Sequence, residues 1–118
     1  MLKRRLDQVD DTERDVHGEG WRSRRLLVAE DGIPYSFHIT VLDRGARLRF
    51  EYARHRETVY CIAGEGSVTD LAAGETVALT LGGLYSAGIG EPHEITALSE
   101  MTLVCIFTPP LDGTEEAD

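Results

Sequence analysis

The sequence has little lysine, cysteine and tryptophan, and it has no long hydrophobic run. No stretch approaches the roughly 18 consecutive apolar residues that a membrane span needs. The charged N-terminus, MLKRRLDQVDD, is not followed by the apolar segment of a signal peptide. We therefore expect a cytoplasmic protein with no membrane partner.

The chain has 2 cysteines, Cys61 and Cys105. They lack the CxxC spacing of a structural zinc site, and each lies within an apolar, strand-like run. In a reducing compartment this pattern favours two buried thiols over a disulfide.

Positive charge is also scarce, because 12 basic residues face 21 acidic ones and the formal net charge is -9. Such a chain repels phosphate backbones, so we expect no nucleic-acid partner. Five arginines do occur within residues 44–56, but Arg47 and Arg49 alternate with apolar residues. This alternation is typical of the solvated face of a strand.

The rest of the sequence predicts an all-β fold in a single domain spanning residues 1–118. The polar N-terminal segment, residues 1–16, offers Asp11 or Thr12 as the cap of one short helical turn. Two strands joined by a turn at Asp31-Gly32 follow from Trp21 onward. Further strands are expected at 45–52, 57–62, 66–71, 75–81, 93–98 and 101–107. Many short strands with minimal helix indicate an antiparallel β-barrel or sandwich.

The C-terminal part of the chain has two notable features. Pro109-Pro110 ends the last strand because neither residue can donate a ladder hydrogen bond, and the acidic tail, residues 112–118, is expected to be flexible. The strand at 101–107, MTLVCIF, is apolar on both faces. A strand of this kind needs cover on its outer face, and a second copy of the chain would supply it, so we expect a homodimer.

The strand PYSFHITVL alternates between an apolar and a polar face. Tyr35, Phe37, Ile39 and Val41 share one face, and His38 and Thr40 lie on the other. In a barrel that holds a ligand, the polar face can line the interior. Alternatively, the apolar face forms the core and His38 is a surface residue. Periodicity does not decide between these two interpretations.

Two glycine-broken stretches, RHRETVYCIAGEG at 54–66 and GLYSAGIGEPHEI at 83–95, carry residue types that bind transition metals. They contribute His55, Glu57, Tyr85 and His93. Imidazole nitrogen, carboxylate oxygen and phenolate oxygen are all donors to divalent metals, and three protein ligands leave open positions for a substrate oxygen. The sequence therefore predicts a small metal-dependent enzyme.

These motifs resemble the two metal motifs of the cupin barrel, with Glu57 at a position where many cupins have histidine. Other stretches sharpen the resemblance to one family, ectoine synthase: TERDV, WRSRRLL, DGIPYSFHIT, Tyr52 and His55 of YARH, VYCIAGEGSV, GLY and LVCIFTPPLDG. The similarity covers nearly the whole chain. It implies a cupin-type β-barrel enzyme that closes N-γ-acetyl-L-2,4-diaminobutyrate to ectoine, a cyclic solute, with loss of water.

The resemblance also implies roles for individual residues. The ligands of an Fe2+ cofactor would be Glu57, Tyr85 and His93, although other divalent metals fit such a set. The substrate pocket would be lined by Trp21, Ser23, Arg25, His38, Thr40, Cys105 and Phe107. The general acid-base group would be Tyr52, His55 or Glu115, and His55 has the alternative role of orienting Glu57. Residues 21, 23 and 25, then 38 and 40, then 105 and 107 are each spaced by two, as residues on one strand face must be.

The chain departs from the family pattern in two places. Residues 86–92, SAGIGEP, replace an acidic and polar run, and Ala117 stands where a histidine is expected. These differences support two alternative hypotheses: a cupin that acts on a different N-acylated diamino acid, and a non-catalytic cupin that binds a small solute.

Overall fold

The structure, a computed structural model, describes residues 1–113. Glu115 and most of the predicted tail lie outside the described residues. The described chain contains two short 3₁₀ helices, η1 (Leu6–Val9) and η2 (Ala29–Asp31). Its strands are β1 (Asp15–Gly18), β2 (Trp21–Leu27), β3 (Ser36–Leu42), β4 (Arg47–Phe50), β5 (Arg56–Ala63), β6 (Glu65–Asp70), β7 (Glu75–Thr80), β8 (Leu84–Ala87), β9 (His93–Ala97) and β10 (Met101–Thr108).

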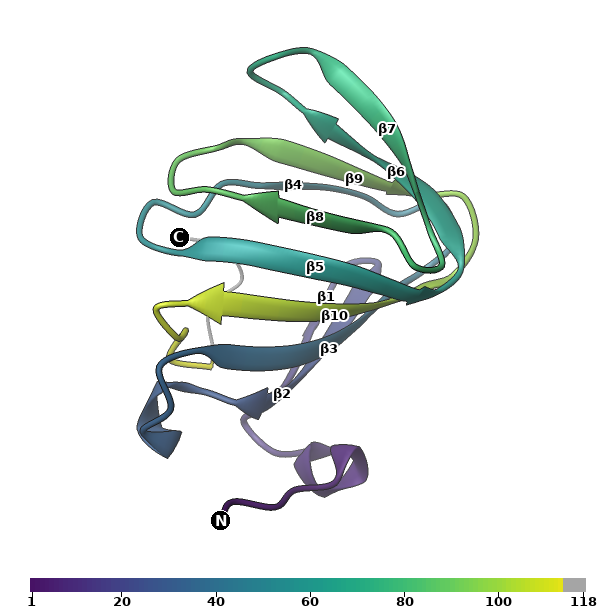
Figure 1. The fold of residues 1–118 in the computed structure, drawn as a ribbon. Helices are drawn as coiled ribbons and strands as arrows, with labels where there is room; N and C mark the ends of the chain where they lie inside the picture. The colour runs from purple at the N-terminus through teal and green to yellow at the C-terminus, as the bar shows by residue number, and fades with distance from the viewer. Residues whose placement is uncertain (114–118) are drawn as a thin grey trace.

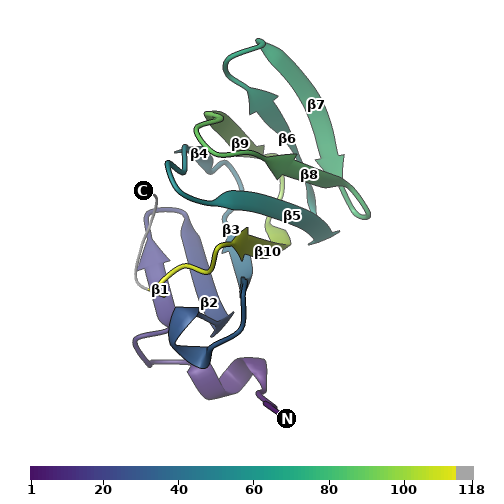
Figure 2. The same ribbon diagram turned by 60° about the vertical axis from the view of Figure 1, so that its left-hand side comes forward.

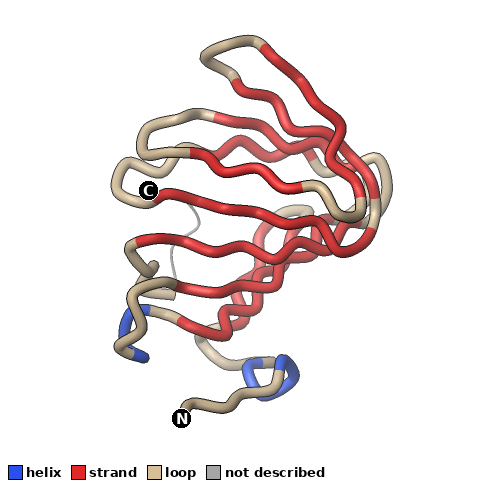
Figure 3. Tube along the Cα trace, in the orientation of Figure 1, coloured by secondary structure: helices blue, strands red, loops and turns tan. Residues whose placement is uncertain are grey.

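The strands form two antiparallel sheets that face each other (Figures 1 and 2). One sheet has the order β1-β2-β3-β10-β5-β8, and the other has the order β4-β9-β6-β7. Strands and loops dominate the trace, with two short helical segments (Figure 3). The prediction of an all-β fold with minimal helix is confirmed. Within residues 1–113, neither helical turn is long or apolar enough to cross a bilayer.

Two local predictions differ from the structure. The helical turn lies at Leu6–Val9, before Asp11 and Thr12, which instead follow the helix in a turn. Strand β1 was not predicted, because it is only four residues long and carries no apolar alternation. It forms through pairing with β2, where Asp15 accepts two hydrogen bonds of 2.9 Å from Arg22.

The turn from β5 to β6 depends on Gly64. Its φ of +86° is a conformation that side chains disfavour, and an added Cβ would lie 2.1 Å from the carbonyl oxygen of Glu100. Glycine therefore lets the corner between the two sheets pack directly against the chain that enters β10. This contact holds the sheets close at one end of the barrel.

The register of the larger sheet determines which side chains face inward. Residues opposite each other in an antiparallel pair point to the same side. One inward row crosses five strands as Arg25, His38, Cys105, Val59 and Tyr85. A second row crosses four strands as Ser36, Phe107, Glu57 and Ala87.

Burial settles which face of the PYSFHITVL strand lines the barrel. Ser36 and His38 are buried, whereas Phe37 and Ile39 are only half-buried on the outside and Tyr35 is exposed. The interpretation with the polar face inward is therefore confirmed. The prediction of two buried thiols is confirmed as well, because Cys61 and Cys105 are both buried and unlinked.

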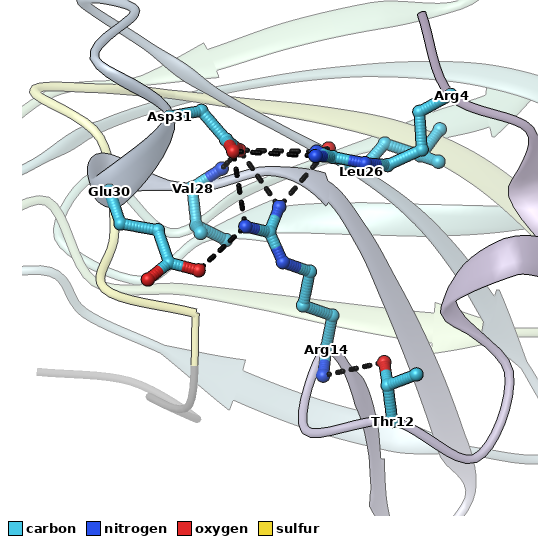
Figure 4. Close-up of polar contacts among 7 residues, drawn as sticks. All are labelled: Arg4, Thr12, Arg14, Leu26, Val28, Glu30 and Asp31. Carbon is cyan, nitrogen blue, oxygen red and sulfur yellow. Dashed lines mark hydrogen bonds and ion pairs between the residues drawn. The ribbon is translucent and has the colours of Figure 1, made fainter.

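A cluster of ion pairs ties the N-terminal segment to the turn between β2 and β3 (Figure 4). The Asp31 carboxylate, 8% exposed, accepts hydrogen bonds from Arg14 at 2.8 and 3.1 Å and from Arg4 at 3.2 and 3.5 Å. It also accepts one from the backbone N–H of Val28 at 2.9 Å. The Arg14 guanidinium holds the pKa of this carboxyl well below its usual range. The neighbouring residue Ala29 donates its N–H to the carbonyl of Leu111, so the cluster also supports the chain that follows β10.

Replacing Asp31 with asparagine removes the negative charge that the two arginines share. We expect it to lower the free energy of unfolding by about 3 kcal/mol, because it leaves the largely buried Arg14 guanidinium with only the exposed Glu30 as an ion-pair partner. Since folding lowers the pKa of Asp31, its contribution is complete above the ordinary carboxyl pKa of 3.8 and declines as the pH falls below that value. Urea unfolding measures this. The difference in the free energy of unfolding between wild type and variant should be largest at pH 7 and should shrink toward pH 3.

Asp7→Asn is the matched control. The Asp7 side chain is 64% exposed and pairs with an exposed Arg5, so its loss should cost less than about 1 kcal/mol. An equal loss of stability in Asp31→Asn and Asp7→Asn would contradict the stabilising role of the Asp31 ion pairs. A loss in Asp31→Asn that does not change with pH would contradict it as well.

Candidate functional site

The three predicted metal ligands meet inside the barrel, although they come from different strands. Glu57 lies near the start of β5, Tyr85 lies on β8 and His93 begins β9 after Pro92. The Glu57 Oε1 atom lies 2.8 Å from His93 Nε2 and accepts a hydrogen bond of 3.0 Å from the Tyr85 hydroxyl. The Tyr85 and His93 rings pack edge to face, with centroids 5.4 Å apart. The two sheets thus bring together residues that are 36 positions apart.

The environment sets the protonation of this cluster. Burial, reinforced by the charge of Glu57, raises the pKa of Tyr85 well above its ordinary value, so the phenol is protonated at neutral pH. Burial alone would lower the pKa of His93. Hydrogen bonds to Glu57 and to the carbonyl of Glu91 outweigh it, and the net shift is upward.

The donor set fits a divalent transition metal. Among residues 1–113, no three side chains of His, Cys, Asp or Glu alone are grouped so as to hold a metal ion. The cluster has one carboxylate and one imidazole, and its third potential ligand is the phenol of Tyr85. The His93 Nδ1 atom lies 3.0 Å from the Glu91 carbonyl oxygen. Donation of Nδ1–H to a carbonyl is the arrangement that orients a metal-binding histidine, and it leaves Nε2, which here contacts Glu57, as the nitrogen that would bind a metal.

Two members of this cluster, Glu57 and Tyr85, line a cavity between the two sheets. The cavity has a volume of about 40 Å³, room for only a few water molecules, so a larger ligand requires the wall side chains to move apart. The lining residues are Trp21, Ser23, Arg25, His38, Thr40, Leu42, Phe50, Tyr52, Glu57, Val59, Tyr85, Ile95, Leu103, Cys105, Phe107 and Leu111. All seven predicted pocket residues are among them. We name this space the central cavity.

The wall opposite the cluster is polar. Arg25 is 3% exposed and donates from Nε to the hydroxyl of Ser23 at 3.3 Å. The Ser23 hydroxyl lies 3.4 Å from that of Thr40. Arg25 and Tyr85 occupy the two ends of one inward row, four strands apart. The central cavity therefore has a cationic end at Arg25 and an end rich in metal-binding groups.

Two further titratable groups line the central cavity in neutral form. Burial and the neighbouring Arg25 lower the pKa of His38 to about 3. Burial, together with the charge of Glu57, raises the pKa of the Cys105 thiol well above its usual value. The Cys105 Sγ atom is 3.6 Å from the Thr40 hydroxyl. An un-ionised thiol is a poor nucleophile, which agrees with a packing role for Cys105.

The predicted acid-base candidates differ in whether they line the central cavity. Tyr52 is 4% exposed and lines the central cavity, with its ring edge-on to Phe107 at a centroid distance of 5.0 Å. His55 is not among the lining residues, and its Nδ1 atom lies 2.7 Å from the carbonyl oxygen of Pro109. Glu115 lies outside the described residues. Of the two candidates that can be placed, Tyr52 is the one that contacts the cavity.

Sequence analysis missed most of the apolar lining. Alternation alone identifies part of it, because Leu42, Val59 and Leu103 lie two positions from predicted site residues on the same strands. Phe50 and Ile95 belong to the smaller sheet, and Leu111 follows β10. Ile95 also lies two positions from His93 on β9, whereas nothing local in the sequence indicates that Phe50 and Leu111 close the cavity.

A second cavity of about 180 Å³ adjoins the first, and Tyr85 lines both. It lies where β7 and β8, the edge strands of the two sheets, face each other without pairing. Asp70, Glu75 and Glu91 line it together with His93. The cluster of Glu57, Tyr85 and His93 is therefore approached from one side by three carboxyl groups, whose negative potential attracts cations.

Comparison with known proteins identifies the family. The profile of the ectoine synthase family matches residues 1–118. The chain belongs to the ectoine synthase family. It is 42% identical to the L-ectoine synthase of Mycobacteroides abscessus, over 100% of this chain and 91% of that protein. It is 43% identical to the L-ectoine synthase of Thermobifida fusca, over 100% of this chain and 88% of that protein.

Solved structures agree with this membership. The crystal structure of ectoine synthase from P. lautus superposes with a TM-score of 0.91 at 39% identity, covering 98% of this chain and 83% of that one. A cupin domain of a transcriptional regulator from Enterobacter cloacae gives a TM-score of 0.66 at 18% identity, covering 77% and 98% of the two chains. The second match shows the fold alone, and it confirms the cupin-type barrel. As a member of the ectoine synthase family, the chain is an enzyme, a lyase of the cyclising dehydratase type.

The burial of Cys105 predicts low chemical reactivity. At pH 8 we expect the folded protein to react with iodoacetamide at least about a hundredfold more slowly than the protein in urea, because alkylation requires the thiolate. Peptide mass spectrometry would follow Cys61 and Cys105 separately. Rapid modification of Cys105 in the folded enzyme would show that its thiol ionises readily and would contradict the packing role.

Proposed function

We propose that the enzyme closes N-γ-acetyl-L-2,4-diaminobutyrate to ectoine with loss of water, using Fe2+ held by Glu57, Tyr85 and His93. The observation that supports this most directly is that Arg25 lines the same cavity as Glu57 and Tyr85, and that His93 contacts Glu57. The substrate has a carboxylate at one end and an acetamide at the other. The cavity offers a partner for each.

The cationic end would hold the substrate carboxylate. A guanidinium is always charged and pairs with a carboxylate through two parallel hydrogen bonds. The Arg25 side chain is buried and hydrogen-bonded to Ser23, which restricts its orientation. The acetamide would then extend along the inward row toward Glu57 and Tyr85.

The residue types at the other end suit a bound metal ion. When bound there, a divalent metal supplies a positive charge that stabilises negative charge developing on the acetamide oxygen. Tyr85 would bind as a phenolate only after losing its proton, which its burial opposes unless the metal is present. Iron(II) is our proposal, and manganese and zinc also accept mixed nitrogen and oxygen ligands.

Ring closure then depends mainly on the conformation in which the cavity holds the substrate. The free α-amine attacks the acetamide carbon, a C–N bond forms, and the carbonyl oxygen leaves as water with two protons from the reacting nitrogens. Because the attack is intramolecular, holding the chain in a bent conformer lowers the entropic barrier. Trp21 and Phe107, which line the cavity, would exclude water from a reaction that releases it.

A side chain must also carry protons between the amine and the departing oxygen. We assign this role to Tyr52, whose buried ring contacts Phe107 and lines the central cavity. His55 would not carry these protons, because it does not line the cavity and its Nδ1 atom lies 2.7 Å from the Pro109 carbonyl oxygen.

The decisive assay is proton NMR of N-γ-acetyl-L-2,4-diaminobutyrate incubated anaerobically with the enzyme and iron(II). We expect ectoine to appear, and Glu57→Ala to lower the rate by at least about a hundredfold, which corresponds to roughly 3 kcal/mol of lost transition-state stabilisation. Chelation of the metal should have a similar effect.

Glu51→Ala provides the control, since Glu51 is an exposed glutamate in the loop before β5. It should retain the wild-type rate and affinity for iron. Full activity in Glu57→Ala, or after chelation, would overturn the proposed metal-dependent mechanism. If the substrate binds without turnover, a different N-acylated diamino acid becomes the favoured substrate.

We also propose that the enzyme is a homodimer formed through the outer face of the larger sheet. An outward row crosses four strands as Leu84, Tyr60, Val104 and Ile39, all of them apolar or aromatic. Leu84 is 63% and Tyr60 is 43% exposed. A continuous apolar strip across the middle of a sheet is typical of a surface that a partner covers, and a second copy offers the same strip in return.

Sedimentation velocity should give about twice the mass of the 13.0-kDa chain. Val104→Glu, which places a charge at the centre of the strip, should shift the protein to monomer. Thr80→Glu on the edge strand β7 of the other sheet should leave the dimer intact. A monomeric wild type, or a dimer unaffected by Val104→Glu, would contradict this interface.

A further inference from the structure

One buried polar atom in the central cavity has no hydrogen-bond partner among the described residues. It is Nε2 of His38, on a side chain that is 2% exposed. Leaving a buried polar group unsatisfied carries a free-energy cost. Such a cost in a cavity wall indicates a group that a ligand satisfies when it binds.

The neighbours of His38 show where that ligand group must lie. Its register partners are Arg25 on β2 and Cys105 on β10, so all three face the central cavity in one row. The hydroxyls of Ser23 and Thr40 in the adjacent row contact Arg25, Cys105 and each other. His38 therefore carries an unsatisfied polar atom at the position of the row next to Arg25.

We infer that His38 accepts a hydrogen bond from the α-amino group of the substrate and so selects amino acids over acids that lack the amine. This inference rests on the proposed function, which places the substrate carboxylate at Arg25. The α-amine and the carboxylate share one carbon atom, so a carboxylate at Arg25 brings the amine to the next position of the row. That position is His38.

The form of the imidazole suits this role. With its proton on Nδ1, the ring offers the Nε2 lone pair to an N–H of the amine. A neutral amine can donate one N–H to His38 while its own lone pair points at the acetamide carbon. The low pKa of His38 agrees with this arrangement, since a ring that does not take up a proton introduces no second cation beside Arg25.

A purely structural role predicts something different. The His38 ring packs against Phe107 at a centroid distance of 5.1 Å, so packing alone would account for its burial. If packing were the only role of His38, an apolar side chain of similar size at this position would change the affinity for ligands with and without the α-amine by the same factor. The two roles are separated by a ligand pair that differs only in the α-amine.

The test measures binding by calorimetry to the full chain without added iron(II), so that no turnover occurs. The ligands are N-γ-acetyl-L-2,4-diaminobutyrate and 4-acetamidobutyrate, the same molecule without the α-amine. In the wild type we expect the amine-bearing ligand to bind more tightly. In His38→Leu this preference should fall by about five- to tenfold, the worth of one neutral hydrogen bond, with little change for 4-acetamidobutyrate.

Two further variants keep the result interpretable. His38→Gln places an amide oxygen close to the position of Nε2 and should restore most of the preference. Ile39→Val, at the next, outward-facing position of β3, should leave both affinities unchanged. If His38→Leu unfolds, His38→Met takes its place, because methionine also lacks the imidazole acceptor and should lose the preference by the same factor.

An unchanged preference in a folded His38→Leu overturns the inference and leaves the proposed function intact if the wild type forms ectoine with iron(II). A loss of the preference in His38→Gln as large as in His38→Leu also overturns it. If the wild type neither binds the amine-bearing ligand nor makes ectoine, the proposed function fails and the inference fails with it.

Discussion

The strand register across β2, β3, β10, β5 and β8 is the constraint on which the rest of the structure depends. Side chains alternate along each strand, so a shift of one residue in any pair would turn the inward rows outward. The observed register places Arg25 and Glu57 inside the barrel together. It also leaves the apolar residues of β3 and β10 on the outer face. One set of backbone hydrogen bonds thus determines both the cavity and the surface that we propose as a dimer interface.

Burying so many polar groups is energetically unfavourable unless each has a partner. Most of those at the site are paired: Glu57 with His93 and Tyr85, and Arg25 with Ser23. The apolar residues needed for stability lie around and below them, in a core that includes Leu42, Met101 and Leu103 among others. Several of these core residues also line the central cavity, so the same packing that stabilises the barrel shapes the walls around the buried polar groups.

Much of the site was predictable from the sequence because its residues lie on strands at a spacing of two. Ser23 with Arg25, His38 with Thr40 and Cys105 with Phe107 are such pairs, and all line the cavity. The family motifs identified Glu57, Tyr85 and His93, for which local pattern alone does not distinguish a ligand from a packing residue. The position of the short helix, strand β1 and the cavity walls from Phe50, Ile95 and Leu111 were not predicted, because they depend on contacts between distant segments.

By itself, the sequence determined the fold class, most strand positions and the residue types of the site, since alternation and glycine-broken turns act over only a few residues. Tertiary structure alone decided which face of the strand at 36–42 points inward, because periodicity is the same for either orientation. It also decided that Tyr52 lines the cavity while His55 is bound to Pro109, and that His38 lies beside Arg25. These outcomes depend on how two sheets close on one another, and a linear pattern carries no information about that packing.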